Sequence, residues 1–271
     1  MRSRRGGDTG STSRREHLGF WASLESALLG GGGGVDLNGW EPDPVDRICP
    51  RCGGPTGPGE VDRSGCAGCR GKRLAWTHTV RLGVYDGDLR RAIMACKYHR
   101  DRGVGRVLGR LLAERVADRF RDSGIGVGEV MVVPVPTTTR RRLMNGGLDH
   151  TMILAEGVSR VLGTRPVRLL ERRHTPHQAG LSAAARARNV AGTIRVRGGR
   201  RPPRADHVVL VDDVRTTGAT ASACFRAIRS GMGERGVGDP PCFWLAVAAV
   251  STRRRDVAGS CGRRSVSVAE N

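Results

Sequence analysis

Residues 208–220 read VVLVDDVRTTGAT, and this stretch decides the expected fold. Four apolar residues precede two adjacent acids, and a turn rich in threonine follows. A continuous apolar run of this kind is typical of a strand that is buried on both faces of a parallel sheet. Ligands of open parallel sheets bind beyond the carboxyl ends of the strands, so we expect Asp212 and Asp213 in a cleft.

The turn after the acids, RTTGAT at residues 215–220, is expected to lead into the N-terminus of a helix. Free backbone N–H groups and the helix dipole bind phosphate at such a place, and Gly218 lets the backbone approach closely. A ligand that presents both a phosphate and hydroxyl groups, as ribose 5-phosphate does, would suit an anion site beside two carboxylates. The acids would accept hydrogen bonds from the ribose hydroxyls or hold magnesium through water. A buried strand that ends at an ordinary helix cap is the alternative interpretation.

The alternation of strand and helix continues in both directions along the chain. Apolar spacing predicts strands over 76–84, 129–136, 166–172 and 242–250, and helices from 88 onward and over 104–120, 148–162 and 218–230. Residues 172–192 are polar and rich in arginine, which predicts a long mobile loop with a helical turn near 183–190. The alternation as a whole predicts an α/β fold with a doubly wound, mostly parallel sheet over 76–250.

Four of the eight cysteines form two CxxC pairs, Cys49 with Cys52 and Cys66 with Cys69. Each pair lets two thiolates face one ion, and four sulfurs satisfy the tetrahedral preference of zinc without leaving an open position for catalysis. We therefore expect a structural zinc ribbon over 45–75 and a reducing cytoplasm. A disulfide or vestigial pairs are the alternatives. The other cysteines are expected to be packing residues or surface thiols: Cys96, Cys224, Cys242 and Cys261.

The chain of 271 residues carries a formal net charge of +20. This charge suits a partner that carries phosphates, such as a nucleic acid, a nucleotide or an anionic membrane surface. Lys72 and Lys97 are the two lysines of the chain, and all the other residues counted as Lys or Arg are arginines. A codon bias toward GC-rich triplets explains that composition equally well.

The ends of the chain are expected to be additions to one main domain. Residues 18–29 have apolar positions at helical spacing, and the glycines at 30–34 form a flexible link, both within an extension over 1–44. Residues 251–271 are expected to form a disordered, partly basic tail. No window approaches the roughly 20 apolar residues of a membrane span, and no secretion signal is evident, so we expect no membrane span and a cytoplasmic protein.

The stretch over 208–220 resembles the signature of type I phosphoribosyltransferases, whose substrate is phosphoribosyl pyrophosphate (PRPP). Several motifs occur in the order of the competence protein F (ComF) family, which the chain resembles over about three quarters of its length. These motifs are the cysteine pairs, YDGDLRRAIMACKYH, VVPVPTTTRRRLMNGG, TPHQAGLSAAARARNV and then the PRPP signature. The resemblance implies a type I phosphoribosyltransferase fold behind an N-terminal zinc ribbon.

The resemblance also implies roles for individual residues. The 5-phosphate would be held by Thr216, Thr217, Gly218, Ala219 and Thr220, and the ribose side, with the catalytic role, by Asp212 and Asp213. Pyrophosphate would lie at the turn of Thr137, Thr138, Thr139 and Arg140. The loop over 172–192 would close over the substrate as a hood, with Arg172, Arg173, Gln178, Arg186 and Asn189 as candidate contacts.

The chain departs from the family where an aromatic residue followed by Asn-Gln is usual, because it carries Leu148, Asp149 and His150 there. A lone histidine at the start of a helix is more often a cap or surface residue than a catalyst. Thr216 occupies the position where some transferases carry an acid that acts on an aromatic base. No base for an aromatic acceptor is therefore evident.

Three functions are compatible with these observations. The first is a magnesium-dependent phosphoribosyltransferase of nucleotide metabolism, in which magnesium, Arg140–Arg142 and the hood neutralise the leaving group and exclude water. The second is a non-catalytic protein that handles incoming single-stranded DNA with a competence helicase during natural transformation. The third is a regulator that senses PRPP without turning it over.

Overall fold

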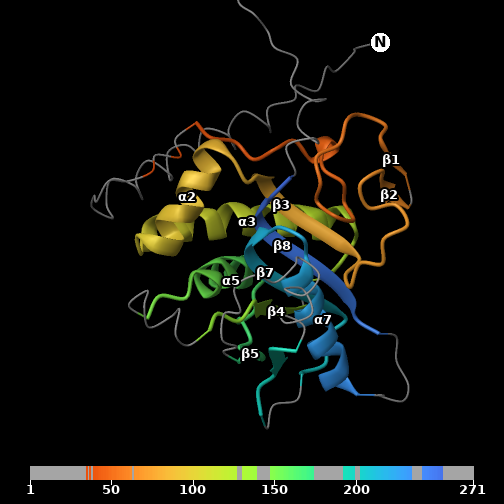
Figure 1. Cartoon of the computed structure of the whole chain (residues 1–271), viewed down its shortest axis with the longest axis vertical. Helices are drawn as coiled ribbons and strands as arrows, with labels where there is room; N and C mark the ends of the chain where they lie inside the picture. Colours follow the sequence, from red (N-terminus) through yellow and green to blue (C-terminus); the bar gives the residue numbers. More distant parts are fainter. Residues whose placement is uncertain are drawn as a thin grey trace, which may run out of the picture.

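The computed structural model describes residues 35–252 apart from positions 36, 38, 63, 127–129, 139–146, 174–191, 199–201 and 234–239. Its centre is a four-stranded parallel sheet in the order β3-β8-β7-β4 (Figure 1). The strands are β3 (His78–Val84), β8 (Cys242–Val250), β7 (His207–Arg215) and β4 (Val130–Pro134). Every residue of β4 is buried, and so is all of β8 after its first residue, which is why these strands have continuous apolar sequences.

Helices cover both faces of this sheet. On one face, α2 (Gly87–Tyr98), α3 (Arg102–Asp122) and α5 (His150–Val161) share a core with Val209 and Val211 of β7. On the other face, α7 (Ala219–Met232) packs with Val208 and Leu210. Successive residues of a strand point to opposite faces, and this alternation creates the two cores. The predicted α/β class with a doubly wound parallel sheet is confirmed.

An aspartate caps the start of three of these helices. Asp86 accepts a hydrogen bond from the Gly87 N–H at 2.9 Å, and Asp101 accepts one from the Val104 N–H at 3.0 Å. Asp149 caps α5 in the same way. Such a cap satisfies an otherwise unpaired donor and typically contributes about 1 kcal/mol. Helix α2 therefore begins one residue before the predicted position 88, and α3 begins at 102 rather than 104.

A second, two-stranded antiparallel sheet is formed by β5 (Leu170–Arg172) and β6 (Ile194–Val196). The strand predicted over 166–172 is therefore shorter than expected and pairs outside the main sheet. Strand β6 has no counterpart among the sequence predictions, because three residues are too few for an apolar period to be recognised. The helical turn predicted near 183–190, the helix over 18–29, the link over 30–34 and tail residues 253–271 lie outside the described residues.

Short segments of the chain lie along both edge strands of the main sheet. Beside β3, the Asp43 N–H donates to the Leu82 carbonyl at 2.7 Å, and the Asp43 carboxylate pairs with the buried Arg81 guanidinium at 2.5 Å. Beside β4, the Val167 N–H donates to the Val132 carbonyl at 2.8 Å. Each edge strand is thus partly paired within the chain.

Helices α3 and α5 cross with their backbones in contact. A Cβ atom on Gly157 of α5 would lie 2.6 Å from the carbonyl carbon of Gly109 in α3. Real Cβ atoms are not found at such a distance, so this crossing requires glycine. Throughout the described part of the chain, the helices lack the combination of length and apolar character that a bilayer span requires.

We predict that Gly157→Ala lowers the free energy of unfolding by about 1 to 3 kcal/mol, because the added methyl group forces two helix backbones apart. The better helix propensity of alanine, about 1 kcal/mol, offsets only part of this loss. Urea unfolding followed by circular dichroism measures the change. Gly126→Ala is the matched control, because a Cβ there meets nothing within 4 Å. If Gly157→Ala were as stable as the wild type, the backbone contact would be wrong.

Candidate functional site

The two adjacent aspartates near the end of β7 point to opposite faces of the sheet. Asp212 has the same parity as Val208 and Leu210, and it lines a pocket on the face covered by α7. Asp213 has the parity of Val209 and Val211, and its side chain lies on the other face, where the residue is only 6% exposed. Of these two carboxylates, Asp212 therefore lines the pocket and Asp213 does not.

Two basic side chains from the neighbouring helices hold the Asp213 carboxylate. Lys97 Nζ, on α2, lies 2.6 Å from Asp213 Oδ2, and His150 Nε2, on α5, lies 3.0 Å from the same oxygen. The cap of α5 is Asp149, and His150 is buried. The interpretation of His150 as a cap or surface residue is therefore wrong. Lys97 was not a candidate on sequence grounds, although its rarity as one of two lysines is a signal.

The two environments give the two aspartates opposite pKa shifts. Burial raises the pKa of Asp212 well above its usual range, and the neighbouring negative charge of Asp213 raises it further. Burial would also raise the pKa of Asp213, but the His150 hydrogen bond and the Lys97 charge outweigh it and hold that pKa below its usual range. Asp213 is therefore a fixed negative charge, while Asp212 favours a neutral form, a cation or hydrogen-bond donors beside it.

A small pocket beside Asp212 lies at the start of α7. Gly218 has a φ of 78°, a left-handed conformation that suits glycine, and it ends the turn that leads into the helix. The Thr217 hydroxyl accepts a hydrogen bond from the Ala219 N–H at 3.3 Å. Four of the five predicted phosphate-binding residues line the pocket: Thr216, Gly218, Ala219 and Thr220. Free first-turn amides and the helix dipole generally attract anions at a helix start, and here the first of these amides, on Ala219, is bonded to the Thr217 hydroxyl.

Arg215, the last residue of β7, lies between this pocket and the cysteine ribbon. It lines the pocket together with Thr216 and Gly218. Burial lowers the pKa of its guanidinium, and the sulfurs of the four-cysteine cluster act against that shift. The pocket beside Asp212 and the ribbon are therefore neighbours in space.

The turn predicted to hold pyrophosphate starts beside the same strand end. Strand β4 pairs with β7, and the Val135 N–H donates to the Val211 carbonyl at 2.9 Å, which brings Thr137 and Thr138 to the carboxyl edge of the sheet. Thr139 and Arg140 lie outside the described residues. Of the predicted hood contacts, Arg172 and Arg173 are described at the end of β5, and the Arg172 charge acts on Cys224 of α7. Gln178, Arg186 and Asn189 lie outside the described residues.

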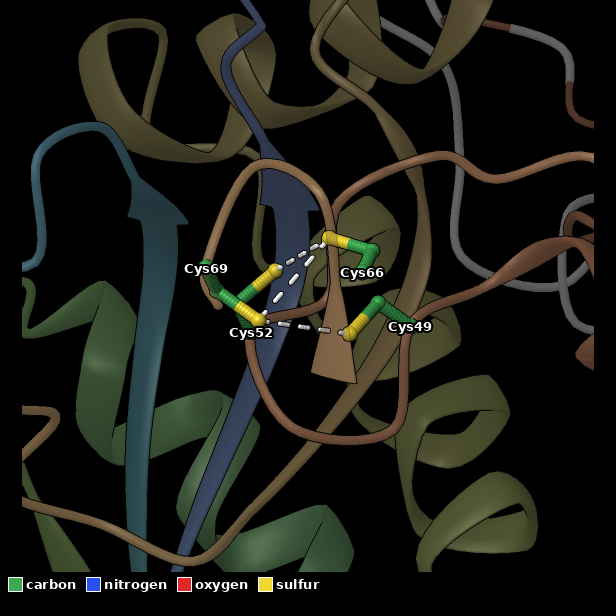
Figure 2. Close-up of side chains that lie close together, drawn as sticks. All are labelled: Cys49, Cys52, Cys66 and Cys69. Carbon is green, nitrogen blue, oxygen red and sulfur yellow. Dashed lines mark hydrogen bonds between the residues drawn. The ribbon is translucent and has the colours of Figure 1, made fainter. Parts of the chain in front are cut away.

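The four cysteines of the two CxxC pairs converge at one point of the ribbon (Figure 2). The ribbon contains a 3₁₀ turn η1 (Val45–Arg47) and the short strands β1 (Val61–Asp62) and β2 (Gly65–Cys66). The sulfur atoms of Cys49 and Cys69 lie 3.7 Å apart, those of Cys52 and Cys66 3.6 Å, and those of Cys66 and Cys69 3.8 Å. A tetrahedral site with zinc–sulfur distances of about 2.3 Å has sulfur–sulfur edges of about 3.8 Å. The cluster is compatible with a structural zinc site.

The four thiols shift one another's pKa values. A hydrogen bond from Cys52 lowers the pKa of Cys49 to about 4, whereas burial raises the pKa of Cys66. Four closely packed sulfurs thus cannot all ionise easily without a positive charge among them, and zinc supplies that charge when it binds thiolates. Cys96 and Cys224 are buried packing residues, Cys242 is partly buried, and Cys261 lies outside the described residues.

Comparisons with known proteins give two groups of similar sequences, whereas no family model matches the chain. DNA utilization protein YhgH of Escherichia coli K12 is 30% identical over 177 residues, which cover 65% of this chain and 74% of that protein. The Salmonella typhi protein of the same name is 29% identical over the same shares. Competence protein F of Haemophilus influenzae is 29% identical over 166 residues, or 60% of this chain and 72% of that protein.

Among solved structures, a purine phosphoribosyltransferase from Pyrococcus horikoshii Ot3 aligns with 64% of this chain and 90% of its own, at 17% identity and a TM-score of 0.26. A superposition this loose supports no argument about function. The fold assignment depends instead on the strand order and the two helical layers described above.

The opposite pKa shifts predict opposite effects of two amide substitutions. Asp212→Asn should stabilise the protein at pH 7 by about 1 kcal/mol, because one pKa unit corresponds to about 1.4 kcal/mol and the substitution removes an ionised form that folding disfavours. Asp213→Asn should destabilise it by about 3 kcal/mol, because Lys97 loses its buried counterion. Urea unfolding measures both.

The pH dependence of these two effects follows from the direction of each shift. The gain from Asp212→Asn should vanish near the usual carboxyl pKa of about 4 and grow as pH rises, because the raised pKa penalises the wild type only where Asp212 would otherwise ionise. The loss from Asp213→Asn should be complete above pH of about 4 and shrink as acid protonates the wild-type carboxylate. Equal effects of the two substitutions at pH 7 would contradict the assignment of the two aspartates to different faces.

Proposed function

The chain belongs to the family that includes DNA utilization protein YhgH and competence protein F, and from this premise we propose that it binds PRPP at the end of β7. In the proposed reaction, the bond between the anomeric carbon and the pyrophosphate oxygen breaks, and an acceptor forms a new bond to that carbon. The observation that carries the proposal is the pocket in which Asp212 faces the glycine turn at the start of α7.

The turn is suited to the 5-phosphate end of the ligand. Gly218 is buried and has no side chain to block the approach of phosphate oxygens at the start of α7, where a helix has free N–H groups. The Ala219 N–H is bonded to the Thr217 hydroxyl, so the next amides of the first turn would be the donors. The hydroxyls of Thr216 and Thr220 are further donors at the lining.

Asp212 is suited to the ribose side and to magnesium. Burial raises its pKa, so hydroxyl donors or a cation beside it would stabilise the ionised carboxylate. Magnesium is usually held by one or two carboxylates together with substrate phosphates, which matches a pocket with one facing acid. When bound, magnesium would neutralise charge on the departing pyrophosphate.

Asp213 would act through its neighbours. Its carboxylate fixes the Lys97 ammonium and the His150 imidazole beside the end of β7, at 2.6 and 3.0 Å. Its role in the proposal is therefore that of a positioning residue, which holds the strand end and the start of α5 together.

Calorimetric titration with PRPP tests the proposal. We expect binding that requires magnesium and that Asp212→Asn weakens at least about tenfold, which corresponds to about 1.4 kcal/mol. Asp118→Asn, at an exposed residue of α3, is the control that should bind as the wild type does. Release of pyrophosphate with candidate acceptors would identify an enzyme, whereas binding without release would identify a PRPP-sensing regulator. Absence of PRPP binding would refute both.

A second candidate function, single-stranded DNA handling with a competence helicase, is favoured by the names of the relatives, which refer to DNA utilization and competence. The net charge of +20 would favour contact with a phosphate backbone. On the described surface, Arg102 and Arg106 are exposed one turn apart at the start of α3, so both can face one strand.

Fluorescence anisotropy with a labelled single-stranded oligonucleotide tests this second function. Log affinity should fall linearly with log salt at about 0.7 per neutralised phosphate, and Arg102→Ala with Arg106→Ala should reduce the slope by about 1.4. Arg121→Ala is the matched control, because Arg121 is already paired with Asp118. A salt-independent affinity would reject DNA binding. Displacement of the oligonucleotide by PRPP would show that both ligands use one pocket.

A further inference from the structure

An indole ring joins the phosphate turn to the cysteine ribbon. Trp76 is 4% exposed, and its ring packs against the turn so closely that a Cβ on Gly218 would lie 2.7 Å from the Cη2 atom. On its other side, the ring meets Phe225 of α7 with centroids 6.1 Å apart. Trp76 therefore supports both the turn and the helix that follows it.

The polar end of the same ring is bound to the first CxxC knuckle. Trp76 Nε1 lies 3.1 Å from the Arg51 carbonyl oxygen and 2.9 Å from Thr79 Oγ1, which in turn donates to the Arg51 carbonyl at 2.9 Å. The Thr79 N–H donates to the Pro50 carbonyl at 2.7 Å. Pro50 and Arg51 are the two residues between Cys49 and Cys52, so the knuckle backbone is the acceptor for Trp76 and β3.

The side chain of Arg51 joins the second knuckle to the first. Its guanidinium donates to three backbone carbonyls, those of Ser64 at 3.0 Å, Cys69 at 2.9 Å and Lys72 at 2.6 Å. A displacement of either CxxC pair would therefore move Arg51, and with it the carbonyl that holds the indole.

We propose that Trp76 is a positioning residue that couples metal occupancy of the four-cysteine site to the shape of the anion pocket. Zinc holds both knuckles at fixed separation, the Arg51 carbonyl then fixes the indole, and the indole fixes Gly218 in its left-handed conformation. Loss of zinc removes the first of these constraints. The pocket then loosens, and any phosphate ligand binds more weakly.

The coupling is reciprocal, because a ligand that binds more tightly to the zinc-loaded protein must strengthen zinc binding by the same factor. The ligand part of the inference rests on the proposed function. The structural part, from the cysteine cluster to the start of α7, does not need any ligand and is tested separately.

Hydrogen exchange followed by mass spectrometry tests the structural part with the full chain. The reporter is the peptide over 218–226, which contains the Ser222 amide bonded to the Gly218 carbonyl at 2.8 Å. The reference is β4, a fully buried strand at the sheet edge farthest from β3. Removing zinc from the wild type with a chelator should speed exchange of the reporter about tenfold, which corresponds to about 1.4 kcal/mol, and leave β4 protected. An unchanged reporter would overturn the proposal.

Trp76→Phe separates the coupling from the stability of the ribbon. This variant keeps the four cysteines, so it should bind one zinc per chain. Because it lacks the Nε1 donor and the part of the ring that touches Gly218, its reporter peptide should exchange faster than that of the zinc-loaded wild type. Trp244→Phe is the matched control, because Trp244 is also buried and donates to His207 Nδ1 at 3.3 Å, but it packs in the core on the opposite face of the sheet from Trp76. If chelation unfolds the whole wild-type protein, the test becomes the exchange of the reporter peptide in zinc-loaded Trp76→Phe. Exchange as slow as in the zinc-loaded wild type would then refute the coupling.

The affinity for zinc in the presence of ribose 5-phosphate tests the reciprocal part. Saturating ribose 5-phosphate should strengthen zinc binding, measured by equilibrium competition with a colorimetric chelator, in the wild type and in Trp244→Phe, but not in Trp76→Phe. If the wild type binds neither ribose 5-phosphate nor PRPP, the proposed function fails while the exchange result still decides the coupling. If it binds ribose 5-phosphate without a change in zinc affinity, the coupling fails while the proposed function stands.

Discussion

The two-residue period of β7 determines where each charged group of the site lies. Val208 to Val211 are completely buried between the two helical layers, and their register with β4 and β8 leaves no freedom at the strand end. A slip of β7 by one residue would move Asp212 and Asp213 to opposite faces from those they now occupy. It would also move each apolar side chain of the strand into the other core. Packing of the strand interior therefore directs the Asp212 carboxylate to the pocket at the start of α7 and the Asp213 carboxylate to Lys97 and His150.

Much of the architecture could be predicted from the sequence, because apolar periodicity and cysteine spacing are local signals. The strands of the main sheet, the helices on its faces and the convergence of four cysteines are of this kind. The contacts of Asp213 could not be predicted in this way, because Lys97 and His150 belong to helices that lie far before Asp213 in the sequence. The pairing of Trp76 with Gly218 is likewise a tertiary contact. Strand β6 is too short to carry a pattern.

Both candidate functions require a place on the protein that receives a phosphate group. They differ in what surrounds that phosphate. A sugar phosphate would use Asp212 on the opposite wall of the pocket, while a DNA strand would need basic side chains beyond it, such as those on α3. The ribbon adds a third element, because the cysteine cluster lies close enough to influence Arg215 at the pocket wall.

The segments along the edge strands have a consequence for self-association. An uncovered strand edge is a template on which a second chain can extend the sheet, and repeated extension leads to aggregates. Here the residue pair Asp43–Leu82 and the contact of Pro50 with Thr79 occupy positions along β3, and Val167 occupies one along β4. The ribbon and the segment before it thus also cover part of the exposed edge of β3. A protein truncated to begin at residue 76 would keep its sheet but present β3 to its neighbours.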